Sequence, residues 1–561
     1  MLANELAPLA DLLKAGAYPH PVDRVEGLTT HISQLFLAGD FAYKLKRPVA
    51  LGFVDFSTLD RRRFFCEEEL RLNRRLAPQL YLAVVPVVRQ GDRVRIGGDG
   101  EVIDYAVQMR RFSQHALLSA HPLNAALIDR LAERVAHFHS RLTPAPPDTD
   151  YGKPGAVLAP MLDNFPPLQS ALAHCDDPEG KLRRCLSRLE RWTRKRFAYL
   201  RPVIEQRRHQ GFIRECHGDM HRGNIVVLDE QPVMFDCLEF NPNLRWIDTM
   251  SEVAFLSMDL AESGANSFAR RLLNRYLEVS GDYAGLCLLR FYQVYRALVR
   301  AKVCAIQLVQ GGPMPATEPA RLPPFVPLPL GPIAADHSPS CPSGLTEPER
   351  IVAKARAGLS HYLALAQTCT GRHRPKLFIT HGLSGSGKTW IGNLLREHLP
   401  IIQIRSDIER KRLFEPQAQG HSPAQQAATL YSAAATEQTY QRLLTLAREL
   451  IEAGFSVLVD ATFLKRRQRA PFLALAQTLN CPSRILVMQA PMHLLRERIN
   501  ARRLAGEDDS DADIDVLSLQ IAHREPLTET EHQHAVFLNS EAPMQVEAVL
   551  AHIAGHAGPC G

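Results

Sequence analysis

The sequence predicts two consecutive folding units, an α+β unit followed by an α/β unit with a mainly parallel sheet. Its 561 residues exceed one compact core and allow two to four domains. Short strand patterns with turn signals fill the first 110 residues, and helical periodicity follows them. After Thr370 strands alternate with helices, a pattern typical of βαβ crossovers and a parallel sheet.

Composition sets limits on the function. Hydrophobic content of 45% and charged content of 22% exclude collagen-like and wholly disordered chains. The net charge of +6 is small for this length and does not predict a nucleic-acid or membrane-surface protein. The 11 cysteines are scattered without CxxC pairs, which favours a reducing cytoplasm over a disulfide framework or zinc ribbon. Without a signal-peptide pattern or an apolar run of about 18 residues, we expect a cytoplasmic chain that spans no membrane.

The expected elements of the first unit follow from local patterns. Residues 31–46 read as a hairpin that turns at 38–40, and residues 62–76 as a helix. Residues 80–112 contain three further short strands. The spacing of apolar residues predicts mostly helix for residues 120–205. A helix, a hairpin and a second helix are expected between residues 205 and 310.

A proline-rich stretch interrupts the helical pattern between about residues 311 and 349, where 11 of the 39 prolines lie. Proline blocks helix and sheet continuation, so we expect an extended linker or insertion there; a ligand for a proline-binding module is the alternative. Helical patterns flank it at 291–310 and 349–367, which favours one helical subdomain. The predicted domains are therefore 1–370 and 371–561.

The second unit carries a phosphate-loop pattern, G-x4-G-K-[ST], after an apolar strand and at the start of an amphipathic helix. Glycines allow successive backbone N–H groups to surround phosphate oxygens, and the helix N-terminus faces the same anion. Lysine would reach the β- and γ-phosphates and threonine would bind Mg²⁺. The expected nucleotide contacts are Gly382, Ser384, Gly385, Ser386, Gly387, Lys388 and Thr389.

Two acids lie at the ends of predicted strands in this unit. Asp460 could hold the magnesium through water, or serve only as a strand-end turn residue. Asp407 could take the proton from an acceptor hydroxyl, and a helix N-cap is nearly as good an explanation.

Arginines spaced to share a helix face in pairs follow the fourth predicted strand: Arg496, Arg498, Arg502 and Arg503. A lid that closes over ATP uses arginines to offset charge on the phosphates, so Arg496 and Arg502 are candidate nucleotide ligands. A solvated basic helix is the alternative.

On these motifs, residues 375–541 resemble the small P-loop kinases of the zeta-toxin and polynucleotide-kinase type, which are grouped with AAA-like domains. The resemblance implies an α/β P-loop NTPase fold and ATP-dependent phosphoryl transfer to a small hydroxylated acceptor.

A second set of phosphotransfer residues lies in the first unit. Asp219 and Asn224 have the D-x4-N spacing of a kinase catalytic loop. A hairpin centred on Glu230 would place Asn224 opposite Asp236, and two oxygen ligands there would form a magnesium site. Asp219 would orient the acceptor hydroxyl and take its proton. His217 and His221 are expected to hold the loop by hydrogen bonds rather than to bind metal.

The segment from His217 to Asn224 matches the H-G-D-x-H-x-x-N pattern and resembles the aminoglycoside phosphotransferase family. The resemblance covers about residues 25–310, and 350–370 less firmly. It implies a bilobal, protein-kinase-like α+β fold that uses ATP or GTP and Mg²⁺ to phosphorylate small-molecule hydroxyl groups. Asp219 takes the catalytic-base position, and Asn224 and Asp236 take the metal-ligand positions.

The same resemblance implies a lysine for the phosphates and a helical glutamate that holds it. Lys44 and Lys46 point to the same face of one strand, so the sequence does not choose between them. Glu69 is the preferred partner and Glu68 the second. The alternative for each of these lysines and glutamates is a solvent-exposed side chain without a role at the site.

Three further features concern the cleft that the resemblance implies. Met109 is placed like an interlobe hinge that contacts adenine. No G-x-G-x-x-G loop covers the phosphates, and either Glu239 or Asp236 could be the second metal ligand.

Complete motif sets in both halves favour a bifunctional small-molecule kinase. One active phosphotransferase with a regulatory nucleotide-binding domain is the second hypothesis. A nucleic-acid end kinase is the third, and the near-neutral charge and absent aromatic–basic interleaving weigh against it. The sequence does not name the acceptor or the oligomeric state.

Overall fold

The computed structural model describes residues 7–30, 32–51, 54–173, 175, 177, 179–311, 346–371, 374–418, 430, 432–505, 514–541 and 546–555. These residues form two compact units. Residues 1–265 and 288–371 make the first unit, and residues 266–287 and 372–561 make the second. The predicted proline-rich insertion lies mostly outside the described residues.

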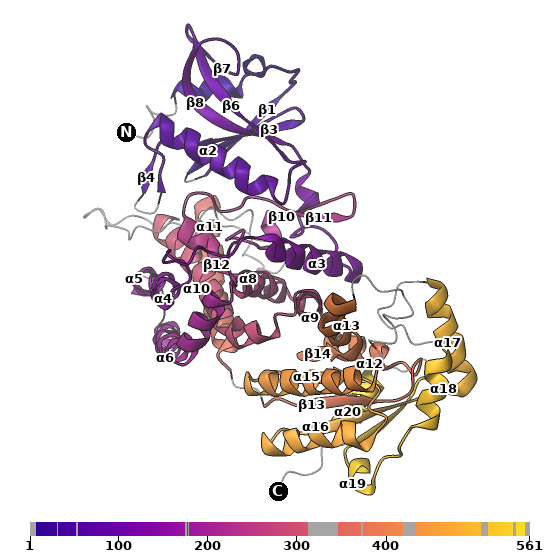
Figure 1. The fold of residues 1–561 in the computed structure, drawn as a ribbon. Helices are drawn as coiled ribbons and strands as arrows, with labels where there is room; N and C mark the ends of the chain where they lie inside the picture. The colour runs from indigo at the N-terminus through magenta and orange to yellow at the C-terminus, as the bar shows by residue number, and fades with distance from the viewer. Residues whose placement is uncertain are drawn as a thin grey trace. The chain divides into compact units, whose positions relative to one another are not determined.

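The first unit begins with a six-stranded antiparallel sheet in the order β1-β2-β3-β8-β6-β7 (Figure 1). Its strands are β1 (Val25–Thr29), β2 (Ser33–Ala38), β3 (Phe41–Lys46), β6 (Tyr81–Gln90), β7 (Arg93–Ile96) and β8 (Glu101–Arg110). The predicted hairpin is β2–β3, where Gly39 adopts a φ of +57° that favours glycine. A short pair, β4 (Ala50–Leu51) and β5 (Val54–Asp55), precedes α2 (Leu59–Arg74).

Helix α2 packs against this sheet through a face that buries Cys66 and Leu72 together with the polar residues Arg62, Glu69 and Asn73. Thr58 caps the helix by accepting a hydrogen bond from the backbone N–H of Arg61. Cys66 lies in a buried cluster with Tyr81 and Val107 of the sheet. The same inward orientation buries Glu69 completely, so α2 delivers a carboxylate to the interior.

Helices make up most of the remainder of the first unit. They are α3 (Ala125–Arg141), α4 (Pro154–Leu162), α5 (Phe165–Ala173), α6 (Lys181–His209), α7 (Pro242–Arg245), α8 (Thr249–Glu262), α10 (Leu286–Gly311) and α11 (Glu347–Cys369). Cys304 of α10 and Leu363 of α11 share one buried cluster with α5, α6 and α8. The two helical patterns beside the proline-rich stretch therefore pack in one core, as predicted.

Two small antiparallel pairs complete the first unit: β9 (Ile213–Glu215) with β12 (Trp246–Asp248), and β10 (Ile225–Leu228) with β11 (Gln231–Met234). The β10–β11 hairpin corrects a predicted register. Asp229 and Glu230 both have positive φ, which makes a two-residue turn. Asn224 therefore lies opposite Phe235 and accepts its N–H at 3.0 Å, rather than lying opposite Asp236.

The second unit is built on a parallel sheet in the order β14-β15-β13-β16-β17 (Figure 1). Its strands are β13 (Leu377–His381), β14 (Ile401–Arg405), β15 (Ser456–Asp460), β16 (Ser483–Gln489) and β17 (Ala535–Asn539). Four of them were predicted and β17 was not. The helices are α9 (Asn266–Ser280), α12 (Lys388–His398), α13 (Ser406–Ala418), α15 (Ala433–Glu452), α16 (Arg466–Thr478), α17 (Met492–Ala505), α18 (Ile514–Ala522), α19 (Glu529–His532) and α20 (Val546–Gly555).

Helix α9 belongs to the second unit although it lies within the sequence of the first. Strand β14 is the last strand of its sheet, so one edge of its backbone lacks a neighbouring strand. Asn274 satisfies that edge: its Oδ1 accepts the N–H of Gln403 at 2.8 Å, and its Nδ2 donates to the carbonyl of Ile401 at 3.1 Å. The structure thus differs from the predicted division at 370 by adding residues 266–287 to the second unit.

Among the described helices, none has both the length and the apolar composition that a membrane crossing needs.

Candidate active sites

A cleft beside β3 and β8 is the first candidate site. It has a volume of about 190 Å³, and its walls are mostly apolar. Met109 lines it from β8, and Lys44 and Asp236 supply charged groups. The cleft thus combines an apolar wall with a charged wall, which suits the base and the phosphates of a nucleotide.

Lys44 lies between two carboxylates in this cleft. Its Nζ donates to Oε1 of Glu69 at 2.8 Å and to Oδ1 of Asp236 at 2.6 Å. Burial lowers the pKa of Lys44, but the charges of Asp236 and Glu69 outweigh burial and raise this pKa well above its usual value. The ammonium group therefore stays charged where phosphate oxygens would need it.

Lys46 has a different environment, although it lies on the same face of β3. Its side chain is fully buried and forms ion pairs with Glu69 and Glu239. Lys46 and Glu239 do not line the cleft, whereas Lys44 and Asp236 do. The geometry therefore favours Lys44 over Lys46 as the phosphate ligand and Asp236 over Glu239 as the metal ligand.

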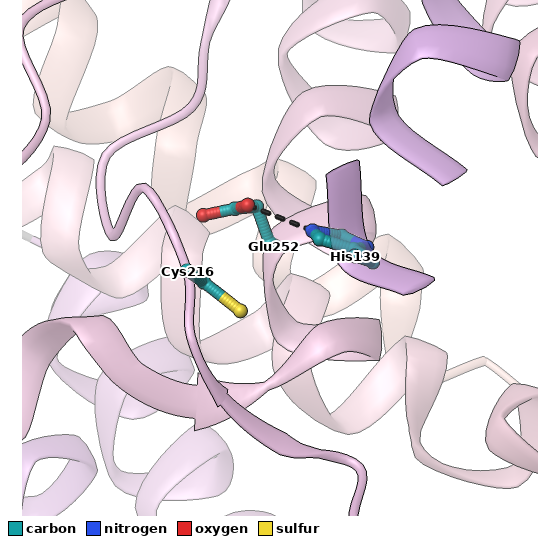
Figure 2. A group of neighbouring side chains, drawn as sticks. All are labelled: His139, Cys216 and Glu252. Atoms are coloured by element: carbon teal, nitrogen blue, oxygen red, sulfur yellow. Dashed lines mark hydrogen bonds and ion pairs between the residues drawn. The ribbon is translucent and has the colours of Figure 1, made fainter. Parts of the chain in front are cut away.

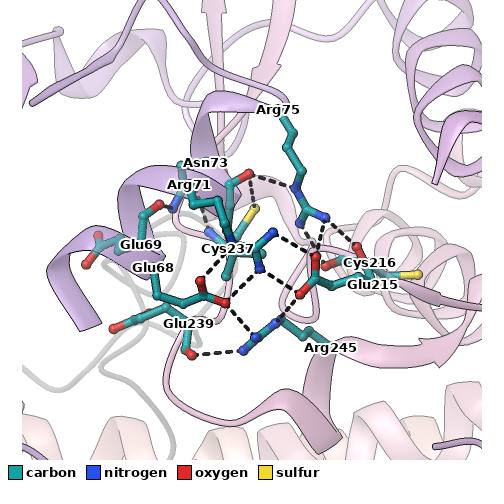
Figure 3. A network of polar contacts seen from close by, with 11 residues as sticks. Glu68, Glu69, Arg71, Asn73, Arg75, Glu215, Cys216, Cys237, Glu239 and Arg245 are labelled. Carbon is teal, nitrogen blue, oxygen red and sulfur yellow. Dashed lines mark hydrogen bonds and ion pairs between the residues drawn. The ribbon is translucent and has the colours of Figure 1, made fainter. Parts of the chain in front are cut away.

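The side chain of Glu68 contacts arginines rather than Lys44 (Figure 3). It accepts hydrogen bonds from Arg71 and Arg245, both at 2.7 Å, and both arginines also contact Glu215. This network connects α2 to the segments before and after the β10–β11 hairpin. Glu69 is thus the carboxylate of α2 that contacts Lys44, in agreement with the preferred assignment.

Asp219 and Asn224 contact one another on the predicted catalytic loop. Nδ2 of Asn224 donates to the carbonyl of Asp219 at 3.0 Å and to its Oδ2 at 3.2 Å. Burial raises the pKa of Asp219, but the nearby His221, His217 and Arg296 lower it more, so the net shift is downward. The carboxylate is therefore ionised at neutral pH and can accept a hydrogen bond from an acceptor hydroxyl.

The two histidines of the loop make the expected hydrogen bonds. Nε2 of His217 lies 2.8 Å from the carbonyl of Phe235, which joins the loop to the end of β11. Nδ1 of His221 accepts the N–H of Gly223 at 3.0 Å.

A buried carboxylate of α8, Glu252, also holds this loop and lies beside His139 and Cys216 (Figure 2). Its Oε1 accepts the N–H of Gly218 at 2.8 Å, and its Oε2 lies 2.8 Å from Nε2 of His139. Cys216 completes a group whose possible metal ligands lie within 4.8 Å of one another. Since both oxygens of Glu252 already have hydrogen-bond partners, the group serves to position the residue before Asp219.

Asp259, about two helical turns after Glu252 on α8, supports the same loop. Its Oδ2 accepts both the backbone N–H and the Nε–H of Arg222 at 3.0 Å. Glu252 and Asp259 are not among the site residues that the sequence predicts. Their spacing in the sequence could have indicated them, because two acids seven residues apart fall on one face of an otherwise apolar helix.

A second, much smaller cavity of about 40 Å³ lies beside Arg296, which contacts the loop that carries Asp219. Its lining includes Tyr151, Trp246, Tyr292, Tyr295, Arg296 and Asp248. Arg296 donates from Nη1 to the carbonyl of Gly218, the residue before Asp219, at 3.0 Å. Asp248 is the one carboxylate among the described lining residues, and the guanidinium of Arg207 binds both of its oxygens at 2.7 and 2.8 Å. The cavity therefore presents aromatic walls and no uncompensated negative charge.

The phosphate loop of the second unit connects β13 to α12. Gly385 has a φ of +80°, and a Cβ there would lie 2.8 Å from the carbonyl oxygen of Leu495, so only glycine fits. Nζ of Lys388 donates to the carbonyl of Leu383 at 2.9 Å. The buried hydroxyl of Ser386 has no hydrogen-bond partner among the described residues. A tightly curved loop with an unpartnered hydroxyl fits a polyphosphate.

Asp460 and Asp407 lie at the ends of neighbouring strands. The sheet register places Asp460 opposite Arg405, two residues before Asp407. Asp460 accepts from Nε2 of Gln403 at 3.1 Å, and burial, then the charge of Asp407, raises its pKa. Asp407 forms an ion pair with Arg405 at 2.7 Å and accepts the N–H of Ile408 at 3.0 Å. Both acids thus lie at the carboxyl edge of the sheet, and their proposed roles remain predictions.

Arg496 and Arg498, the two predicted arginines of α17 whose side chains the structure describes, have different environments. Arg496 is exposed. Arg498 instead supports the phosphate loop: its guanidinium donates to the carbonyl of Gly385 at 3.2 Å and to that of Ser540 at 2.6 Å. The side chain of Arg502 lies outside the described residues.

Two family models match this chain. Residues 60–289 match the phosphotransferase enzyme family, and residues 377–527 match the AAA domain. The predicted resemblance to a phosphotransferase domain followed by a P-loop domain is thereby confirmed, and both domains support phosphoryl transfer of the kinase type.

Similar whole chains and structures were also found. An uncharacterized protein of Mycobacterium tuberculosis is 29% identical over 504 residues, covering 88% of this chain and 90% of that protein. A choline/ethanolamine kinase family protein from Mesorhizobium loti covers 66% of this chain and 100% of its own, with 14% identity and a TM-score of 0.34. The match to an APS kinase from Mycobacterium tuberculosis covers 32% of this chain and 99% of that kinase, with 19% identity and a TM-score of 0.24.

Proposed function

We propose that this chain is an ATP-dependent kinase with two phosphotransfer centres, each of which transfers the γ-phosphate to a hydroxyl group of a small molecule. One observation carries the proposal: Lys44 lies between Glu69 and Asp236 at the cleft of the same unit in which Asn224 binds Asp219. The phosphate loop and its family model support the second centre.

In the first centre, Lys44 holds phosphate oxygens of the nucleotide and Asp219 accepts a hydrogen bond from the acceptor hydroxyl. The hydroxyl oxygen bonds to the γ-phosphorus as the bond to the leaving ADP oxygen breaks, and Asp219 takes the released proton. Asn224 and Asp236 offer the oxygen ligands that Mg²⁺ prefers. When bound, Mg²⁺ would neutralise charge on the phosphates.

In the second centre, the phosphate loop and Lys388 hold the nucleotide, and Asp407 takes the acceptor proton. Thr389 and Asp460 would hold Mg²⁺ there. ATP is the expected nucleotide in both centres, and GTP is the alternative in the first.

The charged groups near the Asp219 loop favour an acceptor that is not a polycation. Arg207 neutralises the carboxylate of Asp248, and Arg296 adds positive charge beside the base. A molecule with several ammonium groups would meet repulsion there without a compensating acid.

The test is a metabolite-library assay with γ-labelled ATP on the wild type, Asp219→Asn and Lys388→Ala. Two active centres predict that each variant loses a separate set of labelled products. If Asp219→Asn labels every acceptor that the wild type labels, the first centre is refuted. If Lys388→Ala removes no product and changes only the rate, the second unit is regulatory.

A further inference from the structure

The backbone of Asp236, the expected metal ligand of the first centre, has an uncommon conformation. Its φ is +62°, in the left-handed region that residues with a Cβ rarely adopt. From this backbone the side chain still directs Oδ1 to Nζ of Lys44 at 2.6 Å. Such a conformation persists only where surrounding groups hold it, so the partners of the adjacent peptide groups determine where the carboxylate points.

The peptide group before Asp236 is held from both sides. Its carbonyl, which belongs to Phe235, lies 2.8 Å from Nε2 of His217 on the loop that carries Asp219. Its N–H, which belongs to Asp236, donates to the hydroxyl oxygen of Tyr81 at 3.1 Å. The carbonyl and the N–H of a trans peptide point in opposite directions, so His217 and Tyr81 together oppose rotation of the peptide plane. Fixing this plane restricts φ of Asp236.

The peptide group after Asp236 is held by α2. The N–H of Cys237 donates to Oδ1 of Asn73 at 2.8 Å, and Nδ2 of Asn73 donates to the carbonyl of Glu69 at 2.9 Å. Asn73 is fully buried, so its amide has a fixed position. Both peptide planes that define the conformation of Asp236 therefore have side-chain partners from other elements.

Tyr81 is the partner that joins Asp236 to the sheet. It is the first residue of β6, and it packs with Cys66 and Val107 in a buried cluster. Only 2% of the residue is exposed, and it lines the cleft beside Asp236. Its ring is therefore held rigidly, which allows the hydroxyl oxygen to act as a fixed acceptor.

We propose that Tyr81 is a positioning residue for the metal site of the first centre, and that its hydroxyl holds the Asp236 peptide so that the carboxylate faces Mg²⁺ on the nucleotide phosphates. The proposal rests on the function of Asp236 as a metal ligand proposed above. Without the hydroxyl, the N–H of Asp236 loses its acceptor and the peptide plane is held from one side only. Nucleotide binding without metal relies on Lys44 and the apolar walls, so the loss should fall on the metal-dependent part of binding.

The experiment measures binding rather than turnover. A non-hydrolysable ATP analogue is titrated calorimetrically into the full chain, once with Mg²⁺ and once with EDTA, and the ratio of the two affinities is the metal-dependent gain. Lys388→Ala is present throughout to suppress binding at the phosphate loop of the second unit. We expect Tyr81→Phe to reduce the gain about 5- to 10-fold, the equivalent of one neutral hydrogen bond, and to change the affinity in EDTA less than about twofold. Electron paramagnetic resonance with Mn²⁺ should show correspondingly less bound metal at equal nucleotide saturation.

Tyr105→Phe is the matched control. Tyr105 packs against the same buried cluster, but its ring faces the guanidinium of Arg63 at 5.4 Å. The substitution removes the same hydroxyl group from a different environment and should leave the metal-dependent gain as in the parent.

Asp236→Asn distinguishes failure of this proposal from failure of the proposed function. If Asp236→Asn removes the gain and Tyr81→Phe keeps it, Tyr81 has no positioning role and the metal ligand stands. Equal losses for Tyr81→Phe with Mg²⁺ and with EDTA, or the same loss for Tyr105→Phe, would show a general disturbance of the cleft and refute the positioning role. If Asp236→Asn keeps the gain, or the parent has none, the metal-ligand assignment and the role of Tyr81 are both refuted.

Discussion

At the residue scale, burial separates side chains that local sequence treats as equivalent. Lys44 reaches the cleft and contacts Asp236, whereas Lys46 is fully buried against Glu239. Glu69 lies between the two lysines and contacts both. Burying an unpaired charge costs several kcal/mol, so the alternation of acids and lysines is what allows these five ionisable groups to lie in one cluster.

The role of Glu69 can be measured with a neighbouring control. Glu69→Gln removes the charge that holds Lys44, and we expect kcat/KM for acceptor phosphorylation at the first centre to fall about 10- to 100-fold, as for a charged hydrogen bond. Glu67→Gln changes an exposed residue that pairs with Arg63 at 2.9 Å and should keep wild-type rates. Equal rates for both variants would show that Lys44 needs no such partner.

The buried His381 should make the stability of the second unit sensitive to acid. Burial lowers its pKa to about 4 at the end of β13, where Nδ1 lies 3.0 Å from the carbonyl of Phe463. Between pH 6.5 and 4 the unfolded chain binds a proton that the folded chain does not, so stability is complete above this range and falls as the pH drops through it. His381→Asn should flatten this fall in thermal unfolding scans between pH 4 and 7. Parallel curves for wild type and variant would contradict the assignment.

At the scale of elements, two helices supply side chains that hold the backbone of neighbouring segments. Helix α8 places Glu252 and Asp259 on one face, and these acids hold the loop that carries Asp219. Helix α9 uses Asn274 to cover the open edge of β14. Both helices satisfy backbone groups that would otherwise be buried without partners.

The contribution of α9 is tested by Asn274→Ala. The substitution leaves one N–H and one carbonyl of β14 without their partner, so the free energy of unfolding of the second unit should fall by about 1–3 kcal/mol. Asn266→Ala, at an exposed asparagine of the same helix, is the control and should be neutral. Denaturant titration of both variants gives the comparison, and equal midpoints would refute a role for Asn274 in covering the edge.

At the scale of the whole molecule, the chain passes from the first unit into the second and back before it reaches the phosphate loop. The segment 266–287 lies between α8, which supports the Asp219 loop, and α10, which carries Arg296. The second unit is therefore discontinuous in sequence, and a domain cut at residue 370 omits part of it.

A truncation experiment follows from this division. Residues 372–561 expressed alone should lack cooperative thermal unfolding, because Asn274 and Glu278, an ion-pair partner of Arg396 at 3.4 Å, are missing. Joining residues 266–287 to this fragment through a flexible linker should restore a cooperative transition. A sharp transition in the shorter fragment would show that α9 is dispensable.

The sequence by itself determined both phosphotransfer motifs, the two fold classes and most elements, because these depend on spacing and periodicity along the chain. Glycines at Gly385 and Gly387, the run from His217 to Asn224, and the alternation of strands and helices are local signals of this kind. Only the tertiary structure distinguished Lys44 from Lys46, set the register of the β10–β11 hairpin, and assigned α9 to the second unit. Each of these depends on burial and on partners far apart in sequence, such as Asp236 for Lys44 and Gln403 for Asn274. Propensity and spacing carry no information about such partners, whereas the cost of burying an unpaired charge or backbone group decides among them.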